Sequence, residues 1–354
     1  MKKHNFSAGP CILPQEVFGK ASEAILDLDQ SGLSILEISH RSKAFVDILE
    51  EARALSLELL GLENKGYQAL FLQGGASLQF YMSALNMLEK KGAYLDTGSW
   101  SAKAIKEAKL LGEVDVLASS SDKNYNYIPK DYKISSDADY FHCTTNNTIF
   151  GTQIKNFPKS DIPVVCDMSS DIFSRDIDFS YFDLIYAGAQ KNMGPAGTTL
   201  VVVKEDVLGK VSRNIPTMLD YKTHISKASA YNTPAVYAVY VSLLNLRWLK
   251  EKGGIKTIQE ENEKKAKLMY SEIDINPLFD GFAAKEDRST MNATFTLNNP
   301  ELKDTFEKML ADAGINGLNG HRSVGGYRAS MYNALPLQSV QVLVEVMDEL
   351  ETKA

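Results

Sequence analysis

Short apolar runs alternate with helical stretches between residues 68 and 204, and this alternation limits the fold more than any other feature of the sequence. The runs are QALFL (68–72), GAYLD (92–96), VDVLAS (114–119), ADYFHCTT (138–145), IPVVCDM (162–168), FDLIYAG (182–188) and GTTLVVVK (197–204). Many are apolar on both faces, which is typical of strands that helices cover on both sides. We therefore expect an α/β fold whose large domain has a mostly parallel sheet between two layers of helices.

Near residue 258 the alternation of apolar runs and helical stretches ends. A charged helix (258–273), an alternating strand (291–297), a helix (300–313), the glycine-rich INGLNGHRSVGGYRAS and a final helix (337–352) follow. This order predicts a smaller α+β domain over 259–354, after a large domain over 16–258. The N-terminal arm, 1–15, contains Gly9, Pro10 and Pro14, and we expect it to be irregular and to pack on the small domain.

Charge and cysteine content exclude several classes of protein. The chain has 354 residues, a formal net charge of −7 and three cysteines, Cys11, Cys143 and Cys166. Without a basic excess, nucleic-acid binding has little support. The odd number of cysteines argues against a disulfide framework and suits a reducing cytoplasm. Because no apolar run reaches the length of a signal peptide or a membrane span, we expect a soluble cytoplasmic protein that binds neither nucleic acid nor membrane.

The sequence signatures of several common sites are absent. The motifs GxxxxGK[ST] and GxGxxG, which would indicate a P-loop or a dinucleotide-binding turn, do not occur, and neither do HExxH or paired CxxC. The adjacent His142 and Cys143 would face opposite sides of a strand, so they would not share a metal ion. We therefore expect no metal site.

Asp167 and Lys191 are the strongest candidates for chemistry. Asp167 stands at the carboxyl end of one apolar run, and Lys191 comes just after LIYAG. In open α/β sheets, ligands gather beyond the carboxyl ends of the strands, so both side chains could face one cleft. The pair suits pyridoxal phosphate (PLP), because a lysine forms a Schiff base with the aldehyde and a carboxylate keeps the pyridine nitrogen protonated. From spacing alone, a structural salt bridge at the strand ends is the commoner interpretation.

Other residues that follow strands could complete such a site. The turn GGAS (74–77) lies between a strand and a helix, where backbone N–H groups bind phosphate, although an ordinary turn explains it equally well. Trp100 could stack on an aromatic cofactor, or be a core residue at the start of a helix. Thr148 could hydrogen-bond a ring substituent, or be a turn residue.

Basic residues gather near both ends of the chain. His321, Arg322 and Arg328 lie within GHRSVGGYRAS, and His40 and Arg41 lie within SHRSK. Arginine binds carboxylate and phosphate groups through two parallel hydrogen bonds. The two groups could therefore bind a small acidic substrate, while a solvated basic face remains the simpler interpretation.

These stretches together resemble one enzyme family. The matching segments are NFSAGPCILP, EISHRS, GGASLQF, DTGSWS, NNTIFGTQ, CDMSSDIFSR, YAGAQKNMGPAG, YNTPAVYAVY and HRSVGGYRASMYNA, which run from the start of the chain nearly to its end. The sequence resembles the phosphoserine aminotransferases, a family of fold-type I PLP enzymes in the class V aminotransferase group. This resemblance favours the catalytic interpretation of Asp167 and Lys191 over a salt bridge.

The resemblance implies a role for each matching residue. Lys191 would be the catalytic Schiff-base lysine, and PLP would be bound by Ala76, Ser77, Trp100, Thr148, Asp167, Gln190, Lys191, Asn232 and Thr233. Asn232 and Thr233 would come from the second subunit of a homodimer. The substrate would be bound by Ser7, His40, Arg41, His321, Arg322 and Arg328, with Arg328 on its α-carboxylate. Some members have arginine in place of Ser77, which puts the strength of phosphate binding in question, but not the identity of the cofactor.

The reaction implied by the resemblance is amino transfer between L-glutamate and 3-phosphohydroxypyruvate, which gives O-phospho-L-serine and 2-oxoglutarate in serine biosynthesis. A second substrate pair, that of 4-phosphohydroxy-L-threonine in vitamin B6 synthesis, stays open. A cysteine desulfurase is a rival, but it needs a reactive cysteine on an exposed loop, and Cys143 and Cys166 lie on candidate buried strands. A non-catalytic PLP-fold protein is another, and the presence of both Lys191 and Asp167 argues against it.

Overall fold

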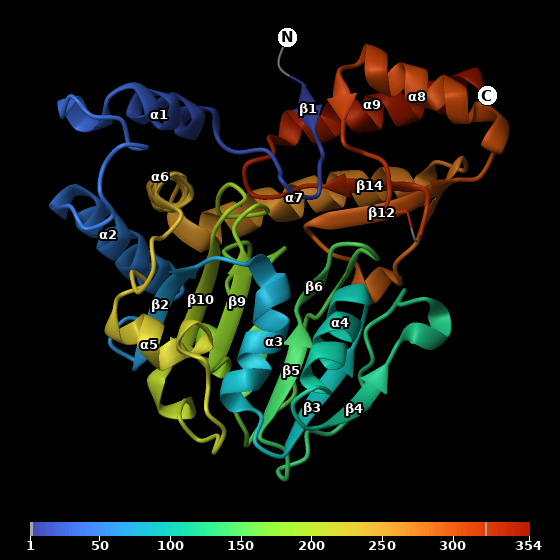
Figure 1. Cartoon of the computed structure of the whole chain (residues 1–354). Coiled ribbons are helices and arrows are strands. Elements are labelled where there is room, and N and C mark those ends of the chain that lie inside the picture. Colours follow the sequence, from blue (N-terminus) through green and yellow to red (C-terminus); the bar gives the residue numbers. More distant parts are fainter. Residues whose placement is uncertain (1–2, 323) are drawn as a thin grey trace.

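A seven-stranded sheet forms the centre of the computed structural model, which describes residues 3–322 and 324–354 (Figure 1). The strand order is β2-β10-β9-β8-β5-β3-β4. The strands are β2 (Tyr67–Leu72), β3 (Lys91–Asp96), β4 (Glu113–Ser119), β5 (Tyr140–Thr144), β8 (Val164–Asp167), β9 (Leu184–Gly188) and β10 (Thr199–Lys204). Neighbours pair in parallel except β10, which is antiparallel to both β2 and β9. The predicted strands and the mostly parallel sheet are confirmed.

Helices cover both faces of this sheet. Helices α3 (Gly75–Met87) and α4 (Ser99–Ala108) lie in front of the strands in Figure 1, whereas α1 (Gln15–Leu26), α2 (Lys43–Leu59) and α6 (Val236–Glu251) belong to the core of the other face. Consecutive strand residues alternate between the two cores: Val201 joins the core under α3 and α4, and Val202 joins the other. The central strands are therefore apolar at most positions on both faces, whereas the edge strand β4 is partly exposed and contains Glu113 and Asp115. The short α5 (Tyr221–Ser226) contacts β2.

The C-terminal part of the chain has its own hydrophobic core. The antiparallel strands β11 (Phe279–Gly281), β12 (Asn292–Leu297) and β14 (Tyr327–Ser330) pack with α7 (Gly254–Ile275), α8 (Lys303–Asp312) and α9 (Leu337–Lys353). Strand β1 (His4–Asn5) pairs with β13 (Ile315–Asn316), and Phe6 of the arm joins this core. Helix α7 contributes Ile258 to the large core and Met269 to the small one. We propose that the two units share this helix, and the boundary at 258/259 stays a prediction.

A short hairpin lies where the two units meet. Strands β6 (Asn146–Asn147) and β7 (Thr152–Gln153) follow β5 and pair with each other. The hairpin also contacts the small unit, because Thr152 forms a bridge with Arg288 and the N–H of Ser289 donates to the carbonyl of Gly151. Within the described residues, no helix combines the length and the apolar character that crossing a membrane requires.

Candidate active site

The carboxyl ends of the parallel strands meet at one edge of the sheet, and the candidate residues follow them. Asp167 ends β8, Lys191 comes just after β9, Thr148 follows β5, and Trp100 lies in the first turn of α4 after β3. The structure brings seven of the expected cofactor residues into the lining of one cavity: Ala76, Ser77, Trp100, Thr148, Asp167, Gln190 and Lys191. These residues lie together because each one stands at or after the carboxyl end of a strand, and the strands that carry them run in the same direction.

The amine of Lys191 lies within this cavity. Its Nζ donates a hydrogen bond to Oγ1 of Thr148 at 2.7 Å and lies 5.9 Å from the centroid of the Trp100 ring. Burial lowers the pKa of Lys191 to about 8, an effect that Asp167 opposes and Arg328 reinforces. A lowered pKa increases the neutral fraction of the amine near pH 8, and the neutral amine is the nucleophile.

Asp167 provides a buried carboxylate on the same wall. The residue is 5% exposed, and its Oδ1 accepts a hydrogen bond from the backbone N–H of Ser169 at 2.9 Å. Burial raises the pKa of this carboxyl group, while Ser169 and the charge of Lys191 lower it. A cationic ring nitrogen next to this carboxylate would offset the cost of burying its charge.

The turn before α3 presents backbone N–H groups to the cavity. Gly74, the N-cap of α3, has a φ of +94°, and a Cβ at this position would lie 2.6 Å from the side chain of Leu78, so the turn requires glycine. N–H groups in the first turn of a helix have no partner within that helix and attract anions. Ala76 and Ser77 lie in that first turn and line the cavity.

Several buried polar atoms at or near the cavity have no hydrogen-bond partner among the described residues. They are Nε1 of Trp100, Oγ1 of Thr144 and Nε of Arg328. Because buried polar groups are nearly always paired, such atoms indicate a polar ligand. With a buried carboxylate, a lysine amine, an indole ring and a helix N-terminus around one cavity, the residues fit a phosphorylated pyridine aldehyde.

The other expected residues do not line this cavity; they are Ser7, His40, Arg41, Asn232, Thr233, His321, Arg322 and Arg328. Asn232 lines a second cavity, where its Nδ2 lies 3.4 Å from Oε1 of Gln73. The side-chain amide of Gln73 also donates to the carbonyl of Thr233 at 3.0 Å. Within one chain, the expected phosphate contacts of Asn232 and Thr233 are therefore not formed.

Basic groups from the small unit approach the cavity. Arg328 lies on β14, and its Nη1 is 3.5 Å from the carbonyl oxygen of Thr148. Burial lowers the pKa of His321, and the nearby charges of Arg328, Arg322 and Lys103 lower it further. These interactions place His321, which is mostly uncharged near pH 7, beside a cationic group formed by Arg322 and Arg328, next to the α4 residue Lys103. By contrast, His40 and Arg41 lie in the segment between α1 and α2.

The N-terminal arm contacts the backbone of Lys191, a contact that sequence reasoning did not predict. The N–H of Cys11 donates to the carbonyl of Gln190 at 3.1 Å, and its thiol donates to the carbonyl of Lys191. A Cβ on Gly9 would lie 3.3 Å from Cγ of Lys191. Burial raises the pKa of the Cys11 thiol to about 12, so the thiolate that desulfurase chemistry needs does not form near neutral pH.

Sequence reasoning also missed part of the cavity lining. The missed residues are Phe80, Thr144, Asn146, Ser169 and Ser170, whereas Gly75 belongs to the predicted turn GGAS. Thr144 and Asn146 belong to the polar run that ends β5 and follows it, and Ser169 and Ser170 follow β8 in the same way. Asp167 was identified because it is a polar residue at the carboxyl end of a strand. The same rule, applied to every strand, would have found Thr144, Asn146, Ser169 and Ser170.

Comparisons with known proteins match this chain along its whole length. A family model described as aminotransferase class-V matches residues 3–343. The chain is 69% identical to a phosphoserine aminotransferase of Flavobacterium psychrophilum, over 100% of both chains. The chain belongs to the phosphoserine aminotransferase family.

Solved structures of phosphoserine aminotransferases share the fold. That of Bacillus circulans subsp. alkalophilus superposes with a TM-score of 0.96 at 44% identity, over 99% of each chain. The PLP-bound structure from Trichomonas vaginalis gives a TM-score of 0.93 at 35% identity, over 98% of this chain and 100% of that one. The chain is thus a class V aminotransferase, and its cofactor is pyridoxal phosphate.

Proposed function

We propose that this chain transfers an amino group between L-glutamate and 3-phosphohydroxypyruvate, with O-phospho-L-serine and 2-oxoglutarate as products, as a step of serine biosynthesis. The observation that carries the proposal is a cationic group formed by Arg328 and Arg322, with His321 beside it, near a cavity that contains a lysine of lowered pKa. When bound, PLP supplies an aldehyde for the lysine and a ring that accepts electrons from the substrate's α-carbon.

The cavity residues hold the cofactor through separate contacts. The N–H groups of Ala76 and Ser77, together with Gln190, bind the phosphate; Asp167 pairs with the ring nitrogen, Thr148 bonds the ring hydroxyl, and Trp100 stacks on the ring. Because Ser77 replaces the arginine of some relatives, the helix N-terminus and the serine hydroxyl must supply most of the attraction for the phosphate.

Lys191 then acts on the substrate. Once the incoming amino acid has displaced it, its amine would remove the proton from the α-carbon as a general base and deliver it to the C4′ carbon of the cofactor as a general acid. A pKa of about 8 suits both roles, because the neutral and the charged amine are then both populated near that pH. The two keto acids use the site in turn, which predicts ping-pong kinetics.

The cationic group binds both ends of the substrate. Arg328 holds the α-carboxylate, helped by Ser7, while His321 and Arg322 bind the distal anion, together with His40 and Arg41. A histidine and an arginine can donate hydrogen bonds to either a γ-carboxylate or a phosphate, so one pocket serves glutamate and phosphoserine. The same chemistry extends to 4-phosphohydroxy-L-threonine, an intermediate of vitamin B6 synthesis.

We propose that the enzyme is a homodimer in the cytoplasm. Asn232 and Thr233 lie outside the cavity of their own chain, and a second copy would bring them to the partner's phosphate site. His40 and Arg41 need the same route if they bind substrate. Light scattering that shows an active PLP-loaded monomer near 39.2 kDa would contradict the dimer.

Half-reactions with single amino acids test the proposed function. The purified PLP-loaded protein is mixed with L-glutamate, O-phospho-L-serine, 4-phosphohydroxy-L-threonine, L-serine or L-alanine, and the absorbance of the cofactor is followed. We expect rapid conversion with glutamate and phosphoserine and much slower conversion with serine. Equal rates with serine and phosphoserine would contradict the substrate assignment.

A further inference from the structure

Arg328 and Lys191 belong to different units, so something must fix the distance between them. Arg328 lies on β14, in the small unit. The contact of its Nη1 with the carbonyl of Thr148 is long, 3.5 Å, and its Nε has no partner among the described residues. The position of the guanidinium therefore depends on how β14 is held against the edge of the large sheet.

Two buried asparagines link that edge to β14. The side-chain Nδ2 of Asn146, on β6, donates to Oγ of Ser170 at 2.8 Å and to Oδ1 of Asn292 at 2.8 Å. Asn292, on β12, donates in turn to Oγ of Ser330 at 3.0 Å. Ser330 stands opposite Asn292 in the β12–β14 register and follows Arg328 by two residues. The path thus runs from the cavity wall at Ser170 to the strand that carries Arg328.

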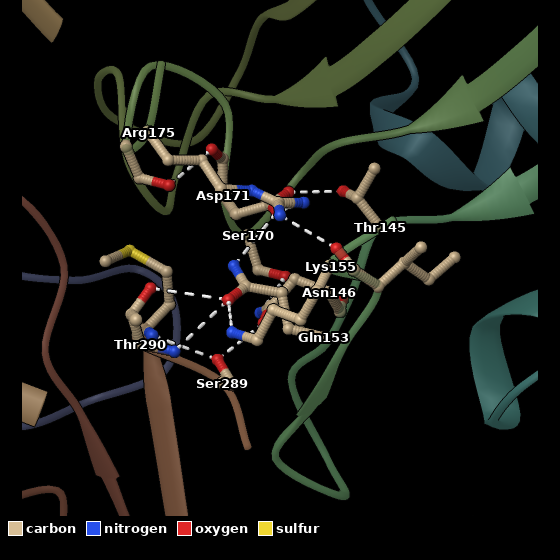
Figure 2. Close-up of polar contacts among 12 residues, drawn as sticks. Thr145, Asn146, Gln153, Lys155, Ser170, Asp171, Arg175, Ser289 and Thr290 are labelled. Carbon is tan, nitrogen blue, oxygen red and sulfur yellow. Dashed lines mark hydrogen bonds and ion pairs between the residues drawn. The ribbon is translucent and has the colours of Figure 1, made fainter. Parts of the chain in front are cut away.

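The surroundings of Asn146 hold its amide in one orientation. Figure 2 shows this residue between Ser170 and Ser289, whose hydroxyl donates to Oδ1 of Asn146, while the hydroxyl of Ser170 donates to its backbone carbonyl at 2.9 Å. Asn146 is 3% exposed and Asn292 is 0% exposed. A turn of either amide would leave a buried donor or acceptor unpaired, so the link has one stable geometry.

Packing at the hairpin turn leaves little room for adjustment. A Cβ on Gly151 would lie 2.8 Å from the carbonyl oxygen of Asn292. The hydroxyl of Thr294, on β12, donates to the carbonyl of Phe150 at 2.9 Å. The same turn carries Thr148, which accepts from Lys191, so a displacement of β12 also displaces a partner of the lysine.

We infer that Asn146 and Asn292 are positioning residues, whose hydrogen-bonded side chains set the place of Arg328 relative to Lys191. Neither asparagine needs to touch the substrate for this. The inference rests on the proposed function, in which Arg328 holds the α-carboxylate. It predicts that a break in the link weakens every substrate with an α-carboxylate by the same factor.

The test uses Asn146→Ala, Asn292→Ala and the double variant, each loaded with PLP. We expect KM for glutamate and for phosphoserine to rise together, by about tenfold, in all three variants. In Asn292→Ala, whose residue lies outside the cavity lining, kcat and the PLP dissociation constant should change less than about threefold. The double variant should raise KM no further than the more impaired single variant does, because both substitutions break the same link. Ser330→Ala, which removes only the outer end of the link and leaves both asparagines in place, should shift KM in the same direction.

A matched control is Asn86→Ala. Asn86 is 2% exposed and its amide likewise bridges two segments, donating to the carbonyls of Met82 and Leu219, at the end of α3 far from the cavity. It should lower the melting temperature and leave KM unchanged. A rise of KM in this control would show a general effect of destabilisation and overturn the inference.

Two further results decide the matter. Asparagine variants that fold and keep the wild-type KM would overturn the inference, and so would a loss of PLP affinity in Asn292→Ala as large as the change in KM, because the link would then support the cofactor cavity and not Arg328. A wild type that does not transaminate would contradict the proposed function instead. Calorimetric binding of 2-oxoglutarate to the PLP-loaded protein, weakened in both variants, would then still support the inference, and unchanged binding would overturn it.

Discussion

The Nζ atom of Lys191 lies 2.7 Å from Oγ1 of Thr148, so the amine donates to a hydroxyl group on the hairpin that also contacts Arg328. Thr148 thus connects the reactive amine to the group proposed to hold the substrate. Since burial lowers the pKa of Lys191 to about 8, this hydrogen bond orients an amine that is partly neutral.

Replacement of Lys191 by alanine should abolish turnover while part of the cofactor binding survives. The helix N-terminus, Asp167 and Trp100 are separate contacts and remain in place. Borohydride should fix the cofactor to the wild-type chain and not to Lys191→Ala, which mass spectrometry of the digested protein measures. An adduct on another lysine, such as Lys204, or turnover near the wild-type rate would contradict the assignment.

Asp167→Asn should keep the covalent link and lose the electron sink. A neutral amide cannot balance the charge of a protonated ring nitrogen, and leaving a buried charge without its partner costs about 3–5 kcal/mol. We expect kcat to fall by at least about 100-fold, while borohydride still fixes the cofactor at Lys191. A kcat within a few-fold of the wild type would show that Asp167 does not pair with the ring.

Arg328→Ala should weaken glutamate and phosphoserine alike, because both have an α-carboxylate. The loss of a charged hydrogen-bonded contact should cost on the order of 2–3 kcal/mol in kcat/KM. His321→Ala and Arg322→Ala should harm phosphoserine more than glutamate. Arg247→Ala is the control. Arg247 pairs with Glu51, so this variant should keep the wild-type kcat/KM for both glutamate and phosphoserine.

The raised pKa of Cys11 predicts that this thiol resists alkylation. With a pKa of about 12, less than about 0.1% of the thiol is ionised at pH 8 in the folded protein. Iodoacetamide should therefore modify Cys11 slowly in the native state and rapidly in urea, as peptide mapping measures. Rapid native modification together with release of sulfide from cysteine would revive the desulfurase alternative.

Lys265 should make stability depend on pH. The residue is 1% exposed, its Nζ donates to the carbonyls of Met331 and Tyr332 at 3.0 and 2.7 Å, and burial lowers its pKa from 10.5 to about 7. Between pH 7 and 10.5 the unfolded chain binds more protons at this site, so this contribution to the free energy of unfolding rises with pH. Below pH 7 both states are protonated and the contribution stays constant.

The urea midpoint at pH 7 and pH 9.5 measures this effect, with Lys265→Met as the control. Relative to the variant, the wild type should gain on the order of 1–3 kcal/mol between the two pH values, since one pKa unit corresponds to about 1.4 kcal/mol. The same difference between wild type and variant at both pH values would show that the pKa of Lys265 is not lowered.

The strands and most of the cofactor cavity could be predicted from the sequence, for one physical reason. Strands that are buried on both faces must be apolar at every position, so their carboxyl ends stand out as the places where polar residues begin. Asp167 and Lys191 could be located in this way. Helix α1 was not predicted, although its buried residues Val17, Ala21 and Ala24 recur at helical spacing as clearly as those of α2.

Contacts between distant segments could not be predicted. Local periodicity does not encode which strands pair, so nothing in the run 197–204 shows that β10 lies antiparallel between β2 and β9. For the same reason, Cys11 could not be placed beside Lys191. The motifs indicate a residue's chemistry, whereas its neighbours depend on the complete fold.

The contacts of the N-terminal arm constrain how the enzyme is made. A ribosome synthesises residues 4–11 long before their partners, because His4 pairs with Ile315, the carbonyl of Ala8 accepts from Tyr332, and Cys11 binds the backbone at Gln190. The arm therefore reaches its final place on the small unit only after β13 and Tyr332 have been synthesised. A nascent chain that stalls before β13 would already contain every residue of the cavity lining, from Gly75 to Lys191, but would lack the strand that holds β1.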